Sequence, residues 1–134
     1  MAALTADRNT PMKGTPDYVV KVPVAASTKI YAGALVAVNA SGLAVPAADS
    51  VGFTVMGRAE AQADNSAGAA SAIDVEVAAG IFKYGAGAIV QANLGANATC
   101  SDDQTVTTAA ATTNDIVAGK IVQVDSDGVW IKVG

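Results

Sequence analysis

The chain has 134 residues, a formal net charge of −4 at pH 7, no histidine and one cysteine. Hydrophobic residues make up 51% but aromatic residues only 4%, so a core must be built mainly from Val, Ile, Leu and Ala. This length is typical of a single domain, and such small side chains favour a thin sandwich or a narrow barrel. Lys and Arg are scattered without a basic stripe, so we expect no nucleic-acid partner.

Residues 1–17 show no apolar period, and Pro11 and Pro16 each remove a backbone donor. We therefore predict an extended N-terminal arm over residues 1–17, either disordered or ordered on a neighbour. A single β domain is predicted over residues 18–134. The first residues lack a basic start followed by an apolar core, so we expect no secretion signal. No apolar stretch has the length needed to span a bilayer, so we expect no membrane partner.

The domain is predicted to begin with a strand over residues 18–24, which ends near Pro23. Residues 32–45 then have the pattern of a β-hairpin, and residues 118–131 repeat that pattern. In each copy an Asn or Asp opens the turn, since its side chain can bond the backbone further on, and a Gly closes it. The similarity is either a structural repeat or the pattern of any hairpin in an Ala/Val/Gly-rich chain. A weaker third copy is predicted at residues 86–95.

The remaining segments predict short strands and polar connections. Further strands are predicted at residues 51–58, 73–77, 81–84 and 104–107, the third returning beside the second after a turn at Gly80. Irregular connections are predicted at residues 60–71, 93–103 and 108–114. In the last strand Val129, Ile131 and Val133 share one face, and Trp130 lies on the other. The fold class that follows is all-β: a small β-barrel or β-sandwich built from hairpins, with an extended N-terminal arm.

The sequence offers no constellation for catalysis. Without histidine, the commonest general base and metal ligand is missing. Cys100 has no partner to activate it and is interpreted as a small buried residue. Residues 125–128 look like part of a calcium loop, but the bidentate Glu of such a loop has no counterpart, so we predict a hairpin turn. Asp102 and Asp103 are interpreted as a solvated pair. We expect no enzymatic activity, no cofactor and no metal.

Several short segments carry a family resemblance. The first is residues 1–11, with the sequence Met-Ala-Ala-Leu-Thr-Ala-Asp-Arg-Asn-Thr-Pro. The others are residues 29–36, 57–60, 64–65, 75–77, 80–82, 102–106 and 128–132. In these segments the chain resembles small head proteins encoded beside the major capsid gene of Mu-like tailed bacteriophages. The chain departs from the family over residues 86–99, which are unusually rich in Ala, Gly and Asn.

The resemblance implies a capsid decoration, or cement, protein without catalytic residues. Such a minor head protein is a β-rich module on the outside of the virion capsid, often a homotrimer, and is made in the bacterial host cytoplasm. The expected partners are the major capsid protein and further copies of the chain itself. The arm residues expected to contact the capsid are Leu4, Arg8, Met12 and Tyr18. The residues expected at the oligomer interface are Tyr31, Arg58 and Trp130.

Two alternatives remain open from the sequence. One is a tail-tube or minor tail structural protein, which would assemble into rings or fibres rather than stop at a small closed oligomer. The other is a non-catalytic ligand-binding β-barrel, for example one that binds a sugar. The shortage of aromatic residues that could line a pocket argues against this second alternative.

Overall fold

A computed structural model describes residues 2–134. Met1, the first residue of the predicted arm, lies outside the described residues. No helix within residues 2–134 has the length and apolar character to cross a membrane. The strands are β1 (Met12–Pro23), β2 (Thr28–Ile30), β3 (Leu35–Val38), β4 (Ala44–Pro46), β5 (Thr54–Ala59), β6 (Ala63–Asn65), β7 (Asp74–Ala86), β8 (Asn97–Cys100), β9 (Thr105–Thr107), β10 (Val117–Asp125) and β11 (Gly128–Val133). Two short 3₁₀ helices, η1 (Gln91–Asn93) and η2 (Ala109–Ala111), lie between strands.

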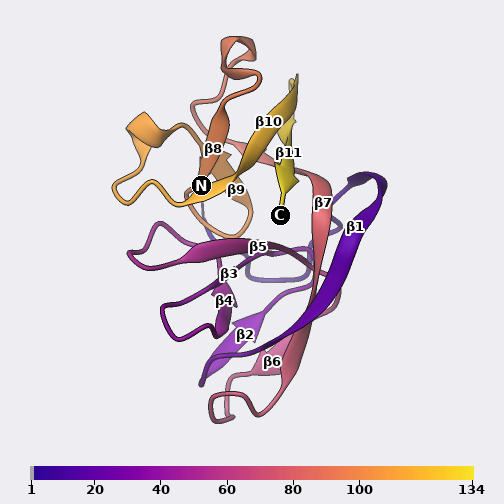
Figure 1. Ribbon diagram of the computed structural model, residues 1–134, viewed down its shortest axis with the longest axis vertical. Helices are drawn as coiled ribbons and strands as arrows, with labels where there is room; N and C mark the ends of the chain where they lie inside the picture. The colour runs from indigo at the N-terminus through magenta and orange to yellow at the C-terminus, as the bar shows by residue number, and fades with distance from the viewer. Residues whose placement is uncertain (1) are drawn as a thin grey trace.

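The predicted all-β barrel is confirmed. Five strands close on one another in the order β7, β11, β10, β8, β9 and back to β7. All of these pairings are antiparallel except that between β7 and β9. Strands β5, β3 and β4 extend the sheet from β7, and β2 pairs with β6 in a separate ribbon. Figure 1 shows the barrel strands in its upper half and these additional strands below them.

Strand β7 joins the two halves of the molecule because its buried residues belong to two hydrophobic clusters. Val75 and Val77 pack in the cluster below the barrel, whereas Phe82 and Tyr84 pack in the barrel itself. Each of these four side chains is at most 1% exposed. Complete burial of an aliphatic or aromatic side chain stabilises a fold by about 1.5–3 kcal/mol. The small aliphatic core expected from the composition is therefore organised along one long strand.

Both predicted hairpins are confirmed. In the β3–β4 hairpin the Asn39 side-chain oxygen accepts hydrogen bonds from the amides of Ser41 (3.0 Å) and Leu43 (3.1 Å). In the β10–β11 hairpin the turn lies at residues 126–127, as predicted for the calcium-like segment. The prediction of a third hairpin at residues 86–95 is wrong, because β7 ends at Ala86 and a loop that contains η1 follows. Its sequence has the hairpin's small residues but no second strand to pair with.

The predicted turn at Gly80 is also wrong, because β7 runs through it without interruption. β1 and β11 pair with residues on either side of this position, so the chain gains more backbone hydrogen bonds by continuing than by turning. The predicted loop at residues 60–71 contains β6, and the predicted irregular segment at 93–103 contains β8. The predicted strand at residues 51–58 begins only at Thr54, and Val51 is 84% exposed.

The last strand has the two faces that alternation predicts. Val129, Ile131 and Val133 are fully buried, and Trp130 lies half-buried on the other face. Cys100 is also buried, as predicted. β1 already begins at Met12, so the last third of the predicted arm belongs to the sheet. Of the other described arm residues, 2–11, several make hydrogen bonds to later parts of the chain.

Candidate interaction site

The N-terminal segment, residues 2–11, is fastened to the barrel of its own chain. The Leu4 amide donates to the Asp103 carboxylate (2.8 Å), and the Arg8 amide donates to the carbonyl of Ala32 (2.8 Å). The Lys83 amide then donates to the carbonyl of the last residue of the segment (3.0 Å). Asp103 is only 2% exposed, so the prediction of a solvated carboxylate pair at residues 102–103 is wrong for this residue. A buried carboxylate here supplies the acceptor that holds the start of the chain.

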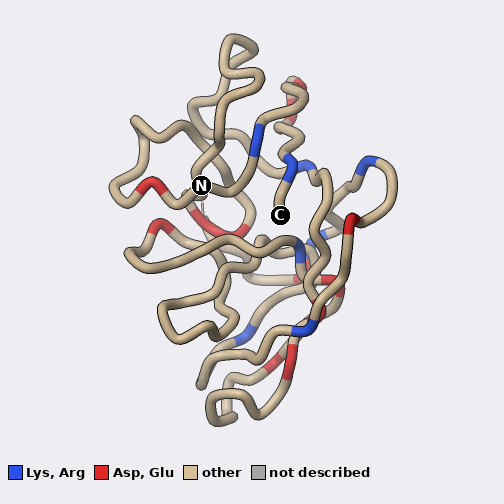
Figure 2. Tube along the Cα trace, viewed as in Figure 1, with Lys and Arg blue, Asp and Glu red and all other residues tan. Residues whose placement is uncertain are grey.

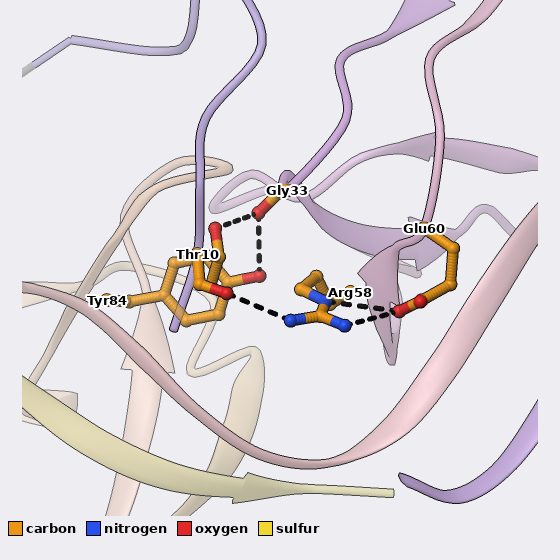
Figure 3. A network of polar contacts seen from close by, with 5 residues as sticks. All are labelled: Thr10, Gly33, Arg58, Glu60 and Tyr84. Carbon is orange, nitrogen blue, oxygen red and sulfur yellow. Dashed lines mark hydrogen bonds and ion pairs between the residues drawn. The ribbon is translucent and has the colours of Figure 1, made fainter. Parts of the chain in front are cut away.

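Two of the residues selected from the sequence, Arg8 and Arg58, both donate hydrogen bonds to Thr10. Figure 3 shows Arg58 with Thr10, Gly33 and Tyr84. Thr10 donates from its hydroxyl to the Gly33 carbonyl (2.6 Å), and the Tyr84 hydroxyl donates to the same oxygen (3.0 Å). Arg58 Nη1 donates to the Thr10 carbonyl at 2.9 Å. Thr10 and Tyr84 are buried. We call Arg8, Thr10, Gly33, Arg58 and Tyr84 the latch, because they hold the N-terminal segment against the barrel.

Burial changes the pKa of two latch side chains, Tyr84 and Arg8. Burial raises the pKa of Tyr84 far above its ordinary value, so the phenol remains a neutral donor. Burial also lowers the pKa of Arg8, whose guanidinium lies 5.1 Å from the centre of the Tyr84 ring. Arg58 lies 4.6 Å from the Phe82 ring centre and forms an ion pair with Glu60 at 2.7 Å. The hydrogen bonds of the latch attach the N-terminal segment to the residues beneath it.

Gly33 is required at the centre of the latch. Its φ is +83°, and a Cβ at this position would lie 1.9 Å from the Arg8 carbonyl oxygen. Only glycine combines the left-handed backbone with such a close approach. In the sequence this glycine stands near the start of the predicted hairpin, residues 32–45, ahead of the predicted turn, and no local pattern indicated its contact with Arg8.

Trp130, a residue selected for the oligomer interface, lies in a charged cluster on the outer face of β11. Its indole N–H donates to Asp125 at 2.9 Å, and the Lys13 ammonium lies 4.4 Å from a ring centre of the indole. Lys83 pairs with Asp125 (3.4 Å) and Asp127 (2.5 Å). Hydrogen bonds from Gln123 and Trp130 lower the pKa of Asp125, and the bond to Asp127 raises the pKa of Lys83. Beside the cluster, residues 85–89 and 125–128 border an open depression of about 360 Å³.

The other selected residues lie apart from one another. Tyr31 is half-buried, with the Lys29 ammonium 5.1 Å from its ring centre. Met12 is half-buried at the start of β1, where it pairs with Phe82. Tyr18, further along β1, is 47% exposed. Leu4, Arg8 and Arg58 therefore make contacts within the chain, and of the arm residues selected only Tyr18 presents a large side chain to solvent. Their roles in binding another protein stay predictions.

Sequence reasoning missed one exposed apolar surface, the loop between β7 and β8. This projecting loop, residues 87–96, carries Val90 (59% exposed) and Leu94 (48% exposed). It lies within an uncharged stretch, residues 84–101. Figures 1 and 2 show it extending from the top of the barrel, without a charged residue, whereas charged residues follow β1 and the β10–β11 hairpin. The missing charges were a usable signal, but the hairpin-like sequence concealed it.

Comparisons with protein-family models, with curated proteins and with solved structures find no match to this chain.

Proposed function

We propose that this chain is a structural protein of a phage head, a decoration protein that binds the outside of the capsid shell and stabilises it. The proposal takes its partner, the major capsid protein, and its place on the virion surface from the resemblance carried by residues 1–11 and the other short segments. Three-fold symmetry of the bound oligomer follows from the same resemblance. The small barrel is a suitable module for such a role because its strands close on one another through backbone pairing.

The observation that carries the proposal is the projecting loop. Val90 and Leu94, four positions apart, expose large aliphatic side chains in a loop that has no charged residue. Exposed apolar groups of this kind mark sites of protein contact, and interface centres are depleted of charged residues. We propose that this loop contacts the major capsid protein.

The latch holds the N-terminal segment against its own chain, so the segment cannot bind the capsid as a free arm would. Thr10 and Arg8 hold residues 2–11 against the barrel through groups that are buried or half-buried. A segment that is already ordered loses little further entropy when a shell covers it. We therefore propose that the segment contacts the capsid as a fixed ridge, with its outward side chains rather than with Arg8.

The proposal is tested by co-sedimentation with empty shells assembled from the major capsid protein of the same genome, and separately with isolated tails. Wild-type protein should bind shells saturably, with a stoichiometry that matches a class of symmetry sites. Leu94→Asp should weaken binding at least tenfold, because a carboxylate would be desolvated in the contact. Val51→Asp is the matched control, since Val51 is 84% exposed in a different turn and should leave binding unchanged.

Three outcomes contradict the proposal in different ways. Binding to tails but not to shells would favour the tail-protein alternative. Binding to neither shells nor tails would contradict a structural role in the virion and would favour the ligand-binding alternative. Equal weakening by Leu94→Asp and Val51→Asp would show that the projecting loop is not the contact, even if the protein binds shells.

A further inference from the structure

Strand β1 leaves one edge of the sheet open. In the part of the chain that the structure describes, β1 pairs only with β7. Figure 1 shows it along the outer side of the molecule. Residues 17–21 of this strand are all exposed, including Tyr18 (47%), Val19 (49%) and Val20 (37%). An exposed edge with apolar side chains is a template for another strand.

The register with β7 shows which backbone groups point to the open edge. The Val24 amide donates to the Ile73 carbonyl at 3.0 Å. This bond makes Pro23 and Asp74, which lie opposite each other, a pair that exchanges no hydrogen bonds. The nitrogen of Pro23, which has no hydrogen to donate, therefore faces the open edge, as is usual for proline in an edge strand.

A second bond gives the same alternation. The Glu60 amide donates to the Glu76 carbonyl at 2.9 Å, so the backbone of Glu76 faces β5 and not β1. Lys21, which lies opposite Glu76, must then direct its own N–H and C=O away from β7. By the two-residue period of the strand, Val19 directs its N–H and C=O to the open edge as well, and Tyr18 directs its own to β7. The pairing with β7 becomes irregular between Lys13 and Tyr18, so of Asp17 only the carbonyl is placed: it faces the open edge because it is trans to the Tyr18 N–H across the peptide bond.

We propose that a second copy of this chain pairs with β1 in antiparallel register, with the two-fold axis at Val19. In this register Val19 lies opposite Val19 of the second copy, and Asp17 of each copy lies opposite Lys21 of the other. Tyr18 likewise lies opposite Val20. The sequence of residues 17–21 is thus self-complementary about its centre: opposite charges meet, and an aromatic side chain meets a β-branched one, which are the favoured cross-strand pairs.

Backbone geometry permits this register. Val19 and Lys21 direct their N–H and C=O groups outward, and Asp17 directs its carbonyl outward. These are also the residues that the register brings opposite one another. The two strands can therefore exchange about four main-chain hydrogen bonds, two between the Val19 residues and two from Lys21 amides to Asp17 carbonyls. Pairing about a two-fold axis closes the assembly, because neither copy keeps a free β1 edge. The inference concerns the isolated chain and does not rest on binding to a shell.

Charge reversal at the pair tests the inference. Sedimentation velocity over a range of concentrations should give wild-type particles twice the mass of Asp17→Lys particles, whether the unit that pairs is a protomer or a trimer. The substitution places Lys opposite Lys twice, so the dissociation constant should rise at least tenfold. The double variant Asp17→Lys/Lys21→Asp restores opposite charges and should restore the larger mass. Thermal unfolding of each variant checks the fold, since Lys21 also faces Glu76 within the chain.

Crosslinking provides an independent test. Directly opposite hydrogen-bonded residues have Cα atoms about 5.5 Å apart, a spacing that a disulfide can bridge. Val19→Cys should therefore form a covalent dimer under mild oxidation at low concentration, whereas the matched control Val51→Cys, at the 84% exposed site, should not. The native Cys100 is buried and does not compete. Equal crosslinking of the two variants would overturn the proposal, and so would equal masses for wild type and Asp17→Lys. Either result would leave the β1 edge for a strand from a different protein.

Discussion

Replacement of Thr10 by Val tests whether the latch hydroxyl holds the N-terminal segment. Thr10 is 4% exposed, and Val has nearly the same shape, so the packing stays while the hydroxyl is lost. Two hydrogen bonds disappear: that from Thr10 to the Gly33 carbonyl (2.6 Å) and that from Arg8 to the hydroxyl (2.7 Å). Neither partner is left unsatisfied, because Tyr84 still donates to Gly33 (3.0 Å) and Arg8 still donates to the Lys83 carbonyl (3.0 Å).

The expected loss is therefore the net value of two bonds and contains no penalty for an unsatisfied group. A neutral hydrogen bond contributes about 1 kcal/mol and one to a charged group about 1.5–3 kcal/mol. The free energy of unfolding of Thr10→Val should fall by about 2–4 kcal/mol, a large part of the roughly 5–15 kcal/mol of a typical domain. At about 3 °C per kcal/mol, the melting temperature should fall by about 6–12 °C.

Urea unfolding, followed by far-UV circular dichroism and by Trp130 fluorescence, measures this loss. Thr10→Ser is the matched control, since it keeps the oxygen and removes one methyl group, and it should cost only about 1 kcal/mol. A Thr10→Val protein within about 0.5 kcal/mol of wild type would refute the reasoning. So would a Thr10→Ser protein that is destabilised as much as Thr10→Val.

Three further predictions follow from buried groups. Gly33→Ala should destabilise the chain more than Thr10→Val in the same urea assay, because its Cβ would lie 1.9 Å from a carbonyl oxygen; Gly14→Ala, with a positive φ but open space, is the control and should cost only about 1 kcal/mol. Burial raises the pKa of Asp103, so its charge disfavours folding above the ordinary carboxyl pKa, and this effect disappears as the pH falls below that value. Asp103→Asn should therefore be more stable than wild type at pH 7 and equally stable at about pH 3, and a constant difference in thermal melts at both pH values would contradict the assignment. Burial also raises the pKa of Cys100 to about 11; thiol labelling at neutral pH should proceed only as the chain unfolds, and rapid labelling of the folded protein would show that the side chain is accessible.

The sequence predicted the fold class and both hairpins because those features rest on local patterns. Asn39 bonds its own turn, and Val129, Ile131 and Val133 alternate as a half-buried strand must. Each hairpin has a glycine at the corresponding position, but the two glycines are required for different reasons. Gly42 has a φ of +76°, whereas a Cβ on Gly128 would lie 2.8 Å from the Tyr84 carbonyl. The similarity in sequence therefore does not extend to the same backbone conformation.

The latch and β7 could not be predicted in the same way, because they depend on contacts between distant residues. Gly80 is a good turn residue, and only the pairing of β1 and β11 with the same strand makes it continue. Arg8 and Arg58 were selected as groups for binding another protein. In the folded chain, however, Arg8 donates to the Thr10 hydroxyl and Arg58 donates to the Thr10 carbonyl. No local pattern in residues 1–11 announces that Tyr84 lies beneath them.

The pairing of β1 with β7 also determines when the chain can fold. Val22 lies opposite Val75, and Thr10 closes over Tyr84, so the first strand has no partner until more than half of the chain has been synthesised. Long-range β pairing of this kind requires loop closure before any contact forms, which places folding in the millisecond-to-second range. During synthesis, residues 17–21 would remain unpaired on both edges. The first strand to be synthesised therefore pairs only after residues 74–82 have left the ribosome.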